Sequence, residues 1–156
     1  MPVQTTVTST PAVAVAGMPK GSDYASRTRA AAVVSNNGLA MCLGATDNVC
    51  KLPTSAGGVA RLYGVARDNV ARDPNFPAGG TAGYVYQVGD SVELIYRGPV
   101  YVIVEDAVVQ GDPAYVRHTS DGALNTQLGS WRGDADTGPA PGYVDRAALV
   151  TGARYL

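Results

Sequence analysis

The sequence contains few of the residues on which metal and redox sites depend. It has two cysteines, Cys42 and Cys50, and a single histidine, His118. Two thiols and one imidazole do not supply the four ligands of a zinc site. We therefore predict no metal and no cofactor. We expect both cysteines to be small buried side chains, with a disulfide between them as the open alternative.

Charged side chains are also scarce, at 16% of residues against about 25% in an average protein. Only Lys20 and Lys51 are lysines, and the remaining cations are all arginines. Arginine is enriched and lysine depleted at protein interfaces, so this composition suits a surface covered by other subunits. A GC-rich genome would produce the same bias. The net charge of −1 argues against a nucleic-acid partner.

Long hydrophobic runs are absent, because no apolar stretch approaches the ~20 residues that a membrane-spanning helix needs. We therefore expect no membrane partner. The opening MPVQTTVTST lacks the basic segment of a secretory signal. This favours a soluble chain synthesised in the cytoplasm.

Glycine and proline, in contrast, are plentiful, with 19 and 10 residues spread along 156. Such punctuation is typical of all-β folds with short strands and tight turns. A chain of this length corresponds to one domain. We predict an extended N-terminal arm, residues 1–19, followed by a single β-rich domain, residues 20–156. The domain is expected to be an antiparallel β-barrel or a jelly-roll-like sandwich.

The strongest strand patterns lie in the middle of the chain. SVELIY (91–96) and AYVRH (114–118) are predicted strands, and VYVIVED (100–106) is apolar on both faces, which predicts a central, doubly covered strand. ARLYGVAR (60–67) is predicted as a strand with a bulge at Gly64. The last strand is expected at ARYL, residues 153–156.

The remaining segments are predicted from capping and turn residues. GSDYASRTRAAA (21–32) favours a short helix capped by Ser22 or Asp23. AVVSNNGLAMCLG (32–44) favours a hairpin that turns at Asn36-Asn37-Gly38. Pro53 and Gly57-Gly58 indicate turns, a Ser-Asp-Gly turn is expected at 120–122, and 70–84 is expected to be a long loop.

Acidic residues raise the question of a catalytic centre. Glu105 and Asp106 are adjacent, so on a strand they point to opposite faces and cannot share one substrate. Asp90 and Asp112 each follow a glycine where a strand begins, a position in which the carboxylate binds turn amides. We predict structural roles for all four, and no catalytic residues.

No other pattern in the chain indicates catalysis. A nucleophile elbow, a phosphate-binding loop and a dinucleotide fingerprint are all missing from the sequence. His118, beside Arg117, is expected at the surface or in a turn, and Cys42 has no neighbouring histidine. The tripeptide Arg132-Gly133-Asp134 is expected to form a turn. Trp131, the only tryptophan, is expected to anchor a core edge or an interface.

Several segments taken together resemble a known family. They are MPVQTT with TPAVAVAGM, then KLPTSAGGVARLYGVARDN, then YQVGDSVELIYRGPVYVIVEDAVVQGDPAYVR, and finally LGSWRGDADTG leading to GARYL. Their combination and order are similar to the structural cement, or capsid decoration, proteins of tailed bacteriophages. The likeness covers nearly the whole chain. It departs from the family in a longer, proline-richer loop at 73–83 and in having little chain after the final strand, which ends at Leu156.

The resemblance implies a non-enzymatic protein on the outer surface of the phage head. Its partners would be the major capsid protein and further copies of itself, as a homodimer or homotrimer. It would stabilise the expanded capsid lattice by bridging neighbouring subunits. The arm and the 73–83 loop would supply contacts, 85–116 would form the rigid body, and deletion of residues 2–16 would leave a folded protein that binds capsids poorly. The rival hypothesis is a β-barrel or sandwich module that binds carbohydrate or peptide through its loops, with Trp131 and tyrosines as stacking platforms.

Overall fold

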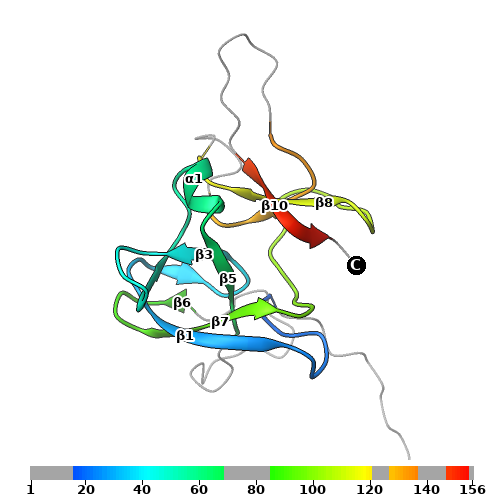
Figure 1. Ribbon diagram of the computed structural model, residues 1–156. Coiled ribbons are helices and arrows are strands. Elements are labelled where there is room, and N and C mark those ends of the chain that lie inside the picture. Colours follow the sequence, from blue (N-terminus) through cyan, green and yellow to red (C-terminus); the bar gives the residue numbers. More distant parts are fainter. Residues whose placement is uncertain (1–15, 69–84, 121–126, 137–146, 155–156) are drawn as a thin grey trace, which may run out of the picture.

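The computed structural model describes residues 16–68, 85–120, 127–136 and 147–154 (Figure 1). These residues fold almost entirely as strands joined by turns, with one short helix among them, which confirms the all-β prediction. The elements are β1 (Ala25–Ala31), β2 (Ser35–Asn36), β3 (Ala40–Leu43), β4 (Val49–Lys51), α1 (Ala56–Val59), β5 (Leu62–Ala66), β6 (Val85–Tyr86), β7 (Ser91–Arg97), β8 (Pro113–Arg117), β9 (Trp131–Arg132) and β10 (Ala147–Arg154).

Five of the strands close into a barrel in the order β1-β4-β3-β5-β7. The neighbours are antiparallel except for β1 and β4, which run parallel where Ala31 pairs with Cys50. The architecture is thus a barrel and not a jelly-roll sandwich, with one parallel pair that the sequence did not predict. Closure leaves no unpaired edge in the barrel, which removes the usual route to strand-by-strand aggregation.

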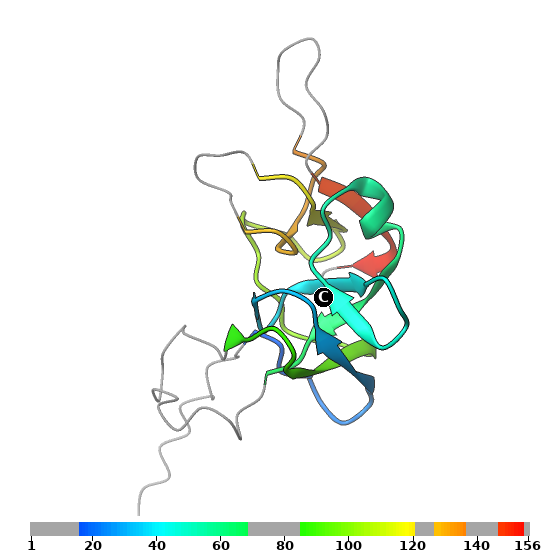
Figure 2. The ribbon, with the colours of Figure 1, turned by 90° about the vertical axis from the view of Figure 1, so that its left-hand side faces the viewer.

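A second layer covers one end of the barrel. The antiparallel sheet β10-β8-β9 and α1 lie there, while β1, β6 and β7 lie at the other end (Figures 1 and 2). Side chains from both layers form a shared apolar cluster: Ala40, Val59, Val65, Ala114, Val116 and Trp131. Trp131 is only 6% exposed, which confirms its predicted place in a core. Each buried valine here stabilises the fold by about 1.5–3 kcal/mol, so the layers form one body.

The barrel has its own core, formed by Ala31, Met41, Cys50, Ala66, Tyr86, Val92 and Leu94. The strand predicted for 91–96 is confirmed as β7, in which Val92 and Leu94 belong to this core. The predicted bulge in β5 is also confirmed. The register with β3 slips so that Met41 pairs with Gly64 and Cys42 pairs with Leu62, which leaves Tyr63 unpaired.

The helix predicted for 21–32 is wrong, because Ala25–Ala31 form β1. This strand pairs with β7 over six residue pairs and with β4 on its other side. The weak helical preference of its alanines is overridden by these hydrogen bonds between strands. The turn predicted at Gly57-Gly58 is also wrong. Both glycines lie in α1, whose N-cap Ser55 accepts a hydrogen bond from the backbone N–H of Gly58.

The central strand predicted for 100–106 is wrong as well. Only isolated bridges form, at Val100 and Val104. Tyr101 and Val104 are 37% and 42% exposed instead of covered. The segment crosses from the barrel to the second sheet, so every second N–H group, starting at Tyr101, binds a different part of the fold. The three acceptors are the carbonyls of Met18, Gly38 and Trp131. Its apolar pattern therefore reflects contact with several elements in turn.

The segment 32–44 contains the two predicted strands and the predicted turn, since Gly38 has a φ of 77°. The pairing differs from a hairpin. β2 pairs with β6 instead of β3. The side chain of buried Asn37 donates hydrogen bonds to the carbonyl of Ala16, at 2.6 Å, and to Asp68, at 3.0 Å. These contacts direct the chain away from a hairpin and bind it to Ala16.

The last residues of the predicted arm are fixed to the barrel. Gly17 donates a hydrogen bond to the carbonyl of Tyr101 at 2.7 Å, and its own carbonyl accepts one from Asp68 at 3.1 Å. A Cβ on Gly17 would lie 2.6 Å from the carbonyl oxygen of Ala66, so only glycine fits. Residues 1–15 of the arm, the 70–84 loop and most of the 120–122 turn lie outside the described residues. The last strand ends at Arg154, and its start at Ala147 is earlier than predicted.

Candidate functional site

The two Gly-Asp dipeptides lie in turns, as predicted. Asp90 accepts a 2.9 Å hydrogen bond from the backbone N–H of Gln87, and Asp112 accepts one of 2.8 Å from that of Val109. The glycine before each aspartate has a left-handed φ, 89° and 92° respectively. Both carboxylates therefore stabilise the turns in which they lie.

Glu105 has a larger structural role than the sequence predicted. Its two carboxylate oxygens lie 2.6 and 2.8 Å from Nε of Arg117, which is completely buried. The same guanidinium donates to Asp136 at 2.6 Å and to the carbonyl of Thr119 at 3.0 Å. Ser130 donates a further hydrogen bond to Glu105. A buried cation of β8 is thus bound to the crossing segment and to the chain after β9.

A second buried guanidinium, that of Arg132, completes what we call the arginine network: Glu105, Asp106, Arg117, Arg132, Asp134 and Asp136. Arg132 contacts Asp134 at 2.7 Å and Asp106 at 3.0 Å, and it lies 3.3 Å from Glu105. Within the Arg132-Gly133-Asp134 tripeptide, the arginine and the aspartate thus form an ion pair with each other. Because Arg132 is only 5% exposed, the tripeptide is not available as an Arg-Gly-Asp motif for binding by another protein.

The arginine network is arranged to hold charge and not to transfer protons. A general acid at neutral pH needs a raised carboxyl pKa. Burial alone would raise the pKa of Asp134, but the hydrogen bond from the backbone N–H of Asp136 and the charge of Arg132 lower it overall. For Arg117, burial disfavours the charged form, but the hydrogen bonds that its guanidinium donates to Glu105 and Asp136 raise the pKa overall. The geometry supports the structural role predicted for these acids.

The cysteines and the histidine do not form a site. Cys42 and Cys50 are buried free thiols, as expected, so the alternative of a disulfide is not realised. Burial raises the pKa of both, and that of Cys50 reaches about 11 with the neighbouring Cys42 adding to the effect. His118, expected at the surface or in a turn, directly follows β8 and is only 7% exposed, so it does not lie at the surface. No cluster of metal-ligating side chains occurs in the described segments, and no helix in them is long and apolar enough to cross a membrane.

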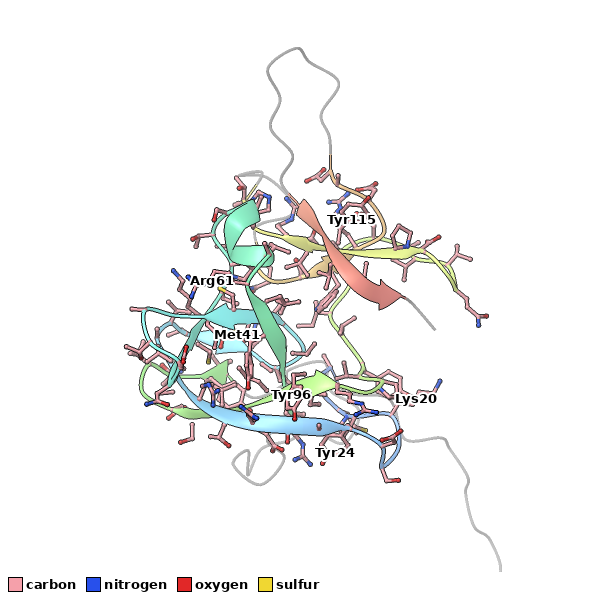
Figure 3. All side chains as sticks on the ribbon, in the orientation of Figure 1. Lys20, Tyr24, Met41, Arg61, Tyr96 and Tyr115 are labelled. Atoms are coloured by element: carbon pink, nitrogen blue, oxygen red, sulfur yellow. The ribbon has the colours of Figure 1, made fainter. Side chains whose placement is uncertain are left out.

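The strongest binding feature is a surface that the sequence did not predict. We call it the arginine–tyrosine surface, and it comprises Arg27 and Arg29 of β1, Tyr63 of β5 and Tyr96 of β7. The tyrosine rings lie 6.0 Å apart, with Arg27 5.8 Å from the Tyr96 centroid and Arg29 4.9 Å from the Tyr63 centroid. Figure 3 shows Tyr96 above β1, at the end of the barrel away from the second sheet.

The strand register explains how these side chains meet. Arg27 and Arg29 pair with Leu94 and Val92, so they lie on the strand face that carries the barrel core. The β5 bulge lies beside Gly64, where a Cβ would be 2.5 Å from the carbonyl oxygen of Ile95. Bulges redirect side chains, and this one directs Tyr63 between Arg29 and Tyr96. The signal in the sequence was the Arg-Thr-Arg alternation, which was assigned to a helix.

The surface carries positive charge that the described chain does not neutralise. Arg29 donates to the carbonyl of Thr28 at 2.9 Å and to the hydroxyl of Tyr63 at 3.2 Å. In the described residues, neither Arg27 nor Arg29 contacts a carboxylate. On the opposite strand face, Arg67 does, with a 2.6 Å ion pair to Glu93. An aromatic, cationic and partly exposed surface of this kind suits protein binding.

Comparison with known proteins assigns the whole chain to one family. Residues 3–155 match the family described as Structural cement protein (E217 gp24/Pam3 gp6). The curated proteins give no match. The family match spans the barrel, the second sheet, the arginine network and the arginine–tyrosine surface. The chain therefore belongs to the structural cement protein family of phages.

Proposed function

We propose that the chain is a non-enzymatic capsid decoration protein that binds the outer surface of the head and stabilises the expanded lattice by bridging neighbouring major capsid subunits. The observation that carries this proposal is the family match over residues 3–155, since membership implies association with the phage capsid. The buried ion pair of Glu105 with Arg117 and the raised thiol pKa values are consistent with a protein that performs no chemistry.

The stabilisation we propose is a linkage effect. A protein that binds the expanded lattice and not the precursor lowers the free energy of the expanded state by its binding term. If the chain is a homodimer or homotrimer, several weak contacts act at once and gain avidity. A body in which the arginine network and the shared apolar cluster join two sheets loses little conformational entropy when it binds.

The rival function, a carbohydrate- or peptide-binding module, receives less support. Its expected stacking platform, Trp131, is 6% exposed and packs in the cluster between the layers. A buried indole is not available to stack on a sugar or peptide.

The arm and the 73–83 loop are proposed to contribute cross-subunit contacts, and the arm offers a direct test. Asn37 binds the carbonyl of Ala16, and Gly17 is bound to Tyr101, so a truncation that spares the fold removes residues 2–15 and not 2–16. We expect this truncated protein to unfold at the same temperature as the full chain but to bind expanded heads at least tenfold more weakly.

The experiment mixes purified full-length or truncated protein with expanded, undecorated heads. Co-sedimentation measures binding, and differential scanning calorimetry measures the melting temperature of the heads. We expect the full chain to sediment with heads and to raise their melting temperature in a concentration-dependent way. A full chain that stays in the supernatant at micromolar concentration refutes the cement function. A truncation that binds as well as the full chain removes the arm from the proposal.

A further inference from the structure

The distribution of carboxylates around the arginines separates two kinds of cation. Arg67, Arg117 and Arg132 each contact at least one carboxylate at 3.0 Å or less. Arg27 and Arg29 instead contact only a backbone carbonyl, a hydroxyl and aromatic rings among the described residues. Their positive charges stand on one strand face, and no carboxylate in the described part of the chain binds either of them. Such a pair of charges provides a site for carboxylates supplied by another molecule.

The tyrosines hold these cations in place before any partner arrives. Arg29 lies over Tyr63 and donates to its hydroxyl, which fixes the long side chain in one conformation. Tyr96 supports Arg27 and is itself 47% exposed, so it offers aromatic area beside the charge. A guanidinium held by a ring loses less side-chain freedom on binding than a mobile one. Arginine and tyrosine are also the side chains that most often dominate the affinity of interfaces.

We propose that the arginine–tyrosine surface is a capsid contact that binds an acidic segment of the major capsid protein. This inference rests on the proposed function and names the chemistry of one contact. Charge complementarity selects the occupant, because Arg27 and Arg29 need two carboxylates spaced along one segment. Planar guanidiniums bind carboxylates with two parallel hydrogen bonds, so the geometry favours Asp and Glu over neutral residues. A second copy of this chain and a nucleic acid are the other anionic occupants.

The test compares four variants of the full chain in binding to expanded heads. Arg27→Glu reverses the exposed charge, Arg27→Lys keeps the charge without the planar fork, and Tyr96→Ala removes the ring. Arg61→Glu is the matched control, because Arg61 is also exposed but lies after α1, where its N–H binds the carbonyl of Gly58. Figure 3 shows it on a different part of the molecule from Tyr96. Thermal unfolding establishes that each variant is folded.

We expect Arg27→Glu to weaken head binding by more than tenfold and Tyr96→Ala by about fivefold to tenfold, which places both among the minority of interface residues whose truncation costs more than about fivefold. Arg27→Lys should lose less affinity for heads than Arg27→Glu, and Arg61→Glu should bind heads as tightly as the wild type does. Raising the salt from 0.05 to 0.5 M should weaken the wild type more than Arg27→Glu, since screening removes the charge contact. Equal binding by Arg27→Glu and Arg61→Glu overturns the proposal.

A second readout separates this inference from the cement function. Titration of the ¹⁵N-labelled free protein with a polyglutamate peptide should shift backbone signals of β1 and β7 in the wild type and not in Arg27→Glu. If wild-type protein ignores heads but shows these shifts, the cement function fails and acid recognition stands. If Arg27→Glu changes the sedimentation mass of the free protein, or if DNA shifts the same signals more strongly than polyglutamate, another occupant replaces the one proposed. Absence of shifts with either probe, together with unchanged head binding, refutes the inference.

Discussion

Two glutamates in this fold form nearly the same contacts at different depths, which allows the stabilisation from burial to be measured. Glu105 binds Arg117 at 2.6 Å and accepts a hydrogen bond from Ser130. Glu93 binds Arg67 at 2.6 Å and accepts one from Ser26 at 2.5 Å. The side chains of the first ion pair are 0% and 6% exposed, and those of the second 33% and 35%. The perturbation is Glu105→Gln, with Glu93→Gln as the matched control.

The expected losses differ because water compensates only the exposed pair. Removing one member of a buried ion pair costs about 3–5 kcal/mol, since the partner is left charged and unpaired. Arg117 keeps Asp136 at 2.6 Å, so we expect the lower limit, about 3 kcal/mol. The exposed pair is screened by solvent and should contribute about 1 kcal/mol or less. With a urea slope of about 2 kcal/mol per molar, the unfolding midpoint should fall by about 1.5 M in Glu105→Gln. In Glu93→Gln it should fall by about 0.5 M at most.

The assay is urea unfolding followed by the fluorescence of Trp131, the only tryptophan and a buried neighbour of Arg132 in β9. Circular dichroism at the same concentrations checks that unfolding is two-state. Equal midpoint shifts for Glu105→Gln and Glu93→Gln would refute the assignment of the arginine network as a buried ion-pair cluster. A larger midpoint shift for Glu93→Gln than for Glu105→Gln would mean that the exposed ion pair stabilises the fold more than the buried one.

Three further outcomes follow from the burial and packing of single residues. Cys42 and Cys50 should react with a thiol reagent at pH 8 more than tenfold more slowly in the native than in the urea-unfolded protein, because burial raises the pKa of each and that of Cys50 to about 11. Asp134, whose pKa is lowered from 3.8, stabilises the fold above that pH, and this contribution is lost as the pH falls through the lowered value. Asp134→Asn should therefore flatten the decline of urea midpoints measured from pH 6 to pH 2. Gly64→Ala should lower the free energy of unfolding by about 1–3 kcal/mol, since its Cβ would lie 2.5 Å from a backbone carbonyl oxygen of β7. Gly57→Ala, whose Cβ would lie 3.8 Å from its nearest neighbour, should not lower it. Thermal melts of the two glycine variants check this difference.

The parts of the fold that sequence reasoning placed correctly have signals confined to a few consecutive residues. β7 alternates between core and surface, and the β5 bulge follows from a glycine inside a strand pattern. β1 was assigned to a helix because local propensity was the only available signal, and its partners β4 and β7 are about 20 and 65 residues away. The segment 100–106 was assigned to a strand because its apolar residues do not reveal that they contact three different elements.

The candidate site was less accessible to sequence reasoning than the fold. The Gly-Asp turns could be predicted, since Asp90 and Asp112 bind amides three residues away. The arginine–tyrosine surface joins β1, β5 and β7, so its four side chains come together only after the barrel closes. Glu105 was correctly given a structural role, but its two arginine partners lie 12 and 27 residues further along the chain. No local pattern identifies such partners.

The distribution of arginine in this chain follows from two opposing electrostatic requirements. Inside the fold, a guanidinium is tolerated only when carboxylates neutralise it, and Arg117 and Arg132 satisfy that condition with several acids. On a binding surface the reverse holds, because a cation already neutralised within its own chain has little left to gain from a partner. Arg27 and Arg29 satisfy this second condition in the described residues, and they belong to β1, which lies at the end of the barrel opposite the second sheet (Figure 1). The arginine network therefore makes the body rigid, and Arg27 and Arg29, which no described carboxylate neutralises, remain available to the acidic segment that we propose as their partner.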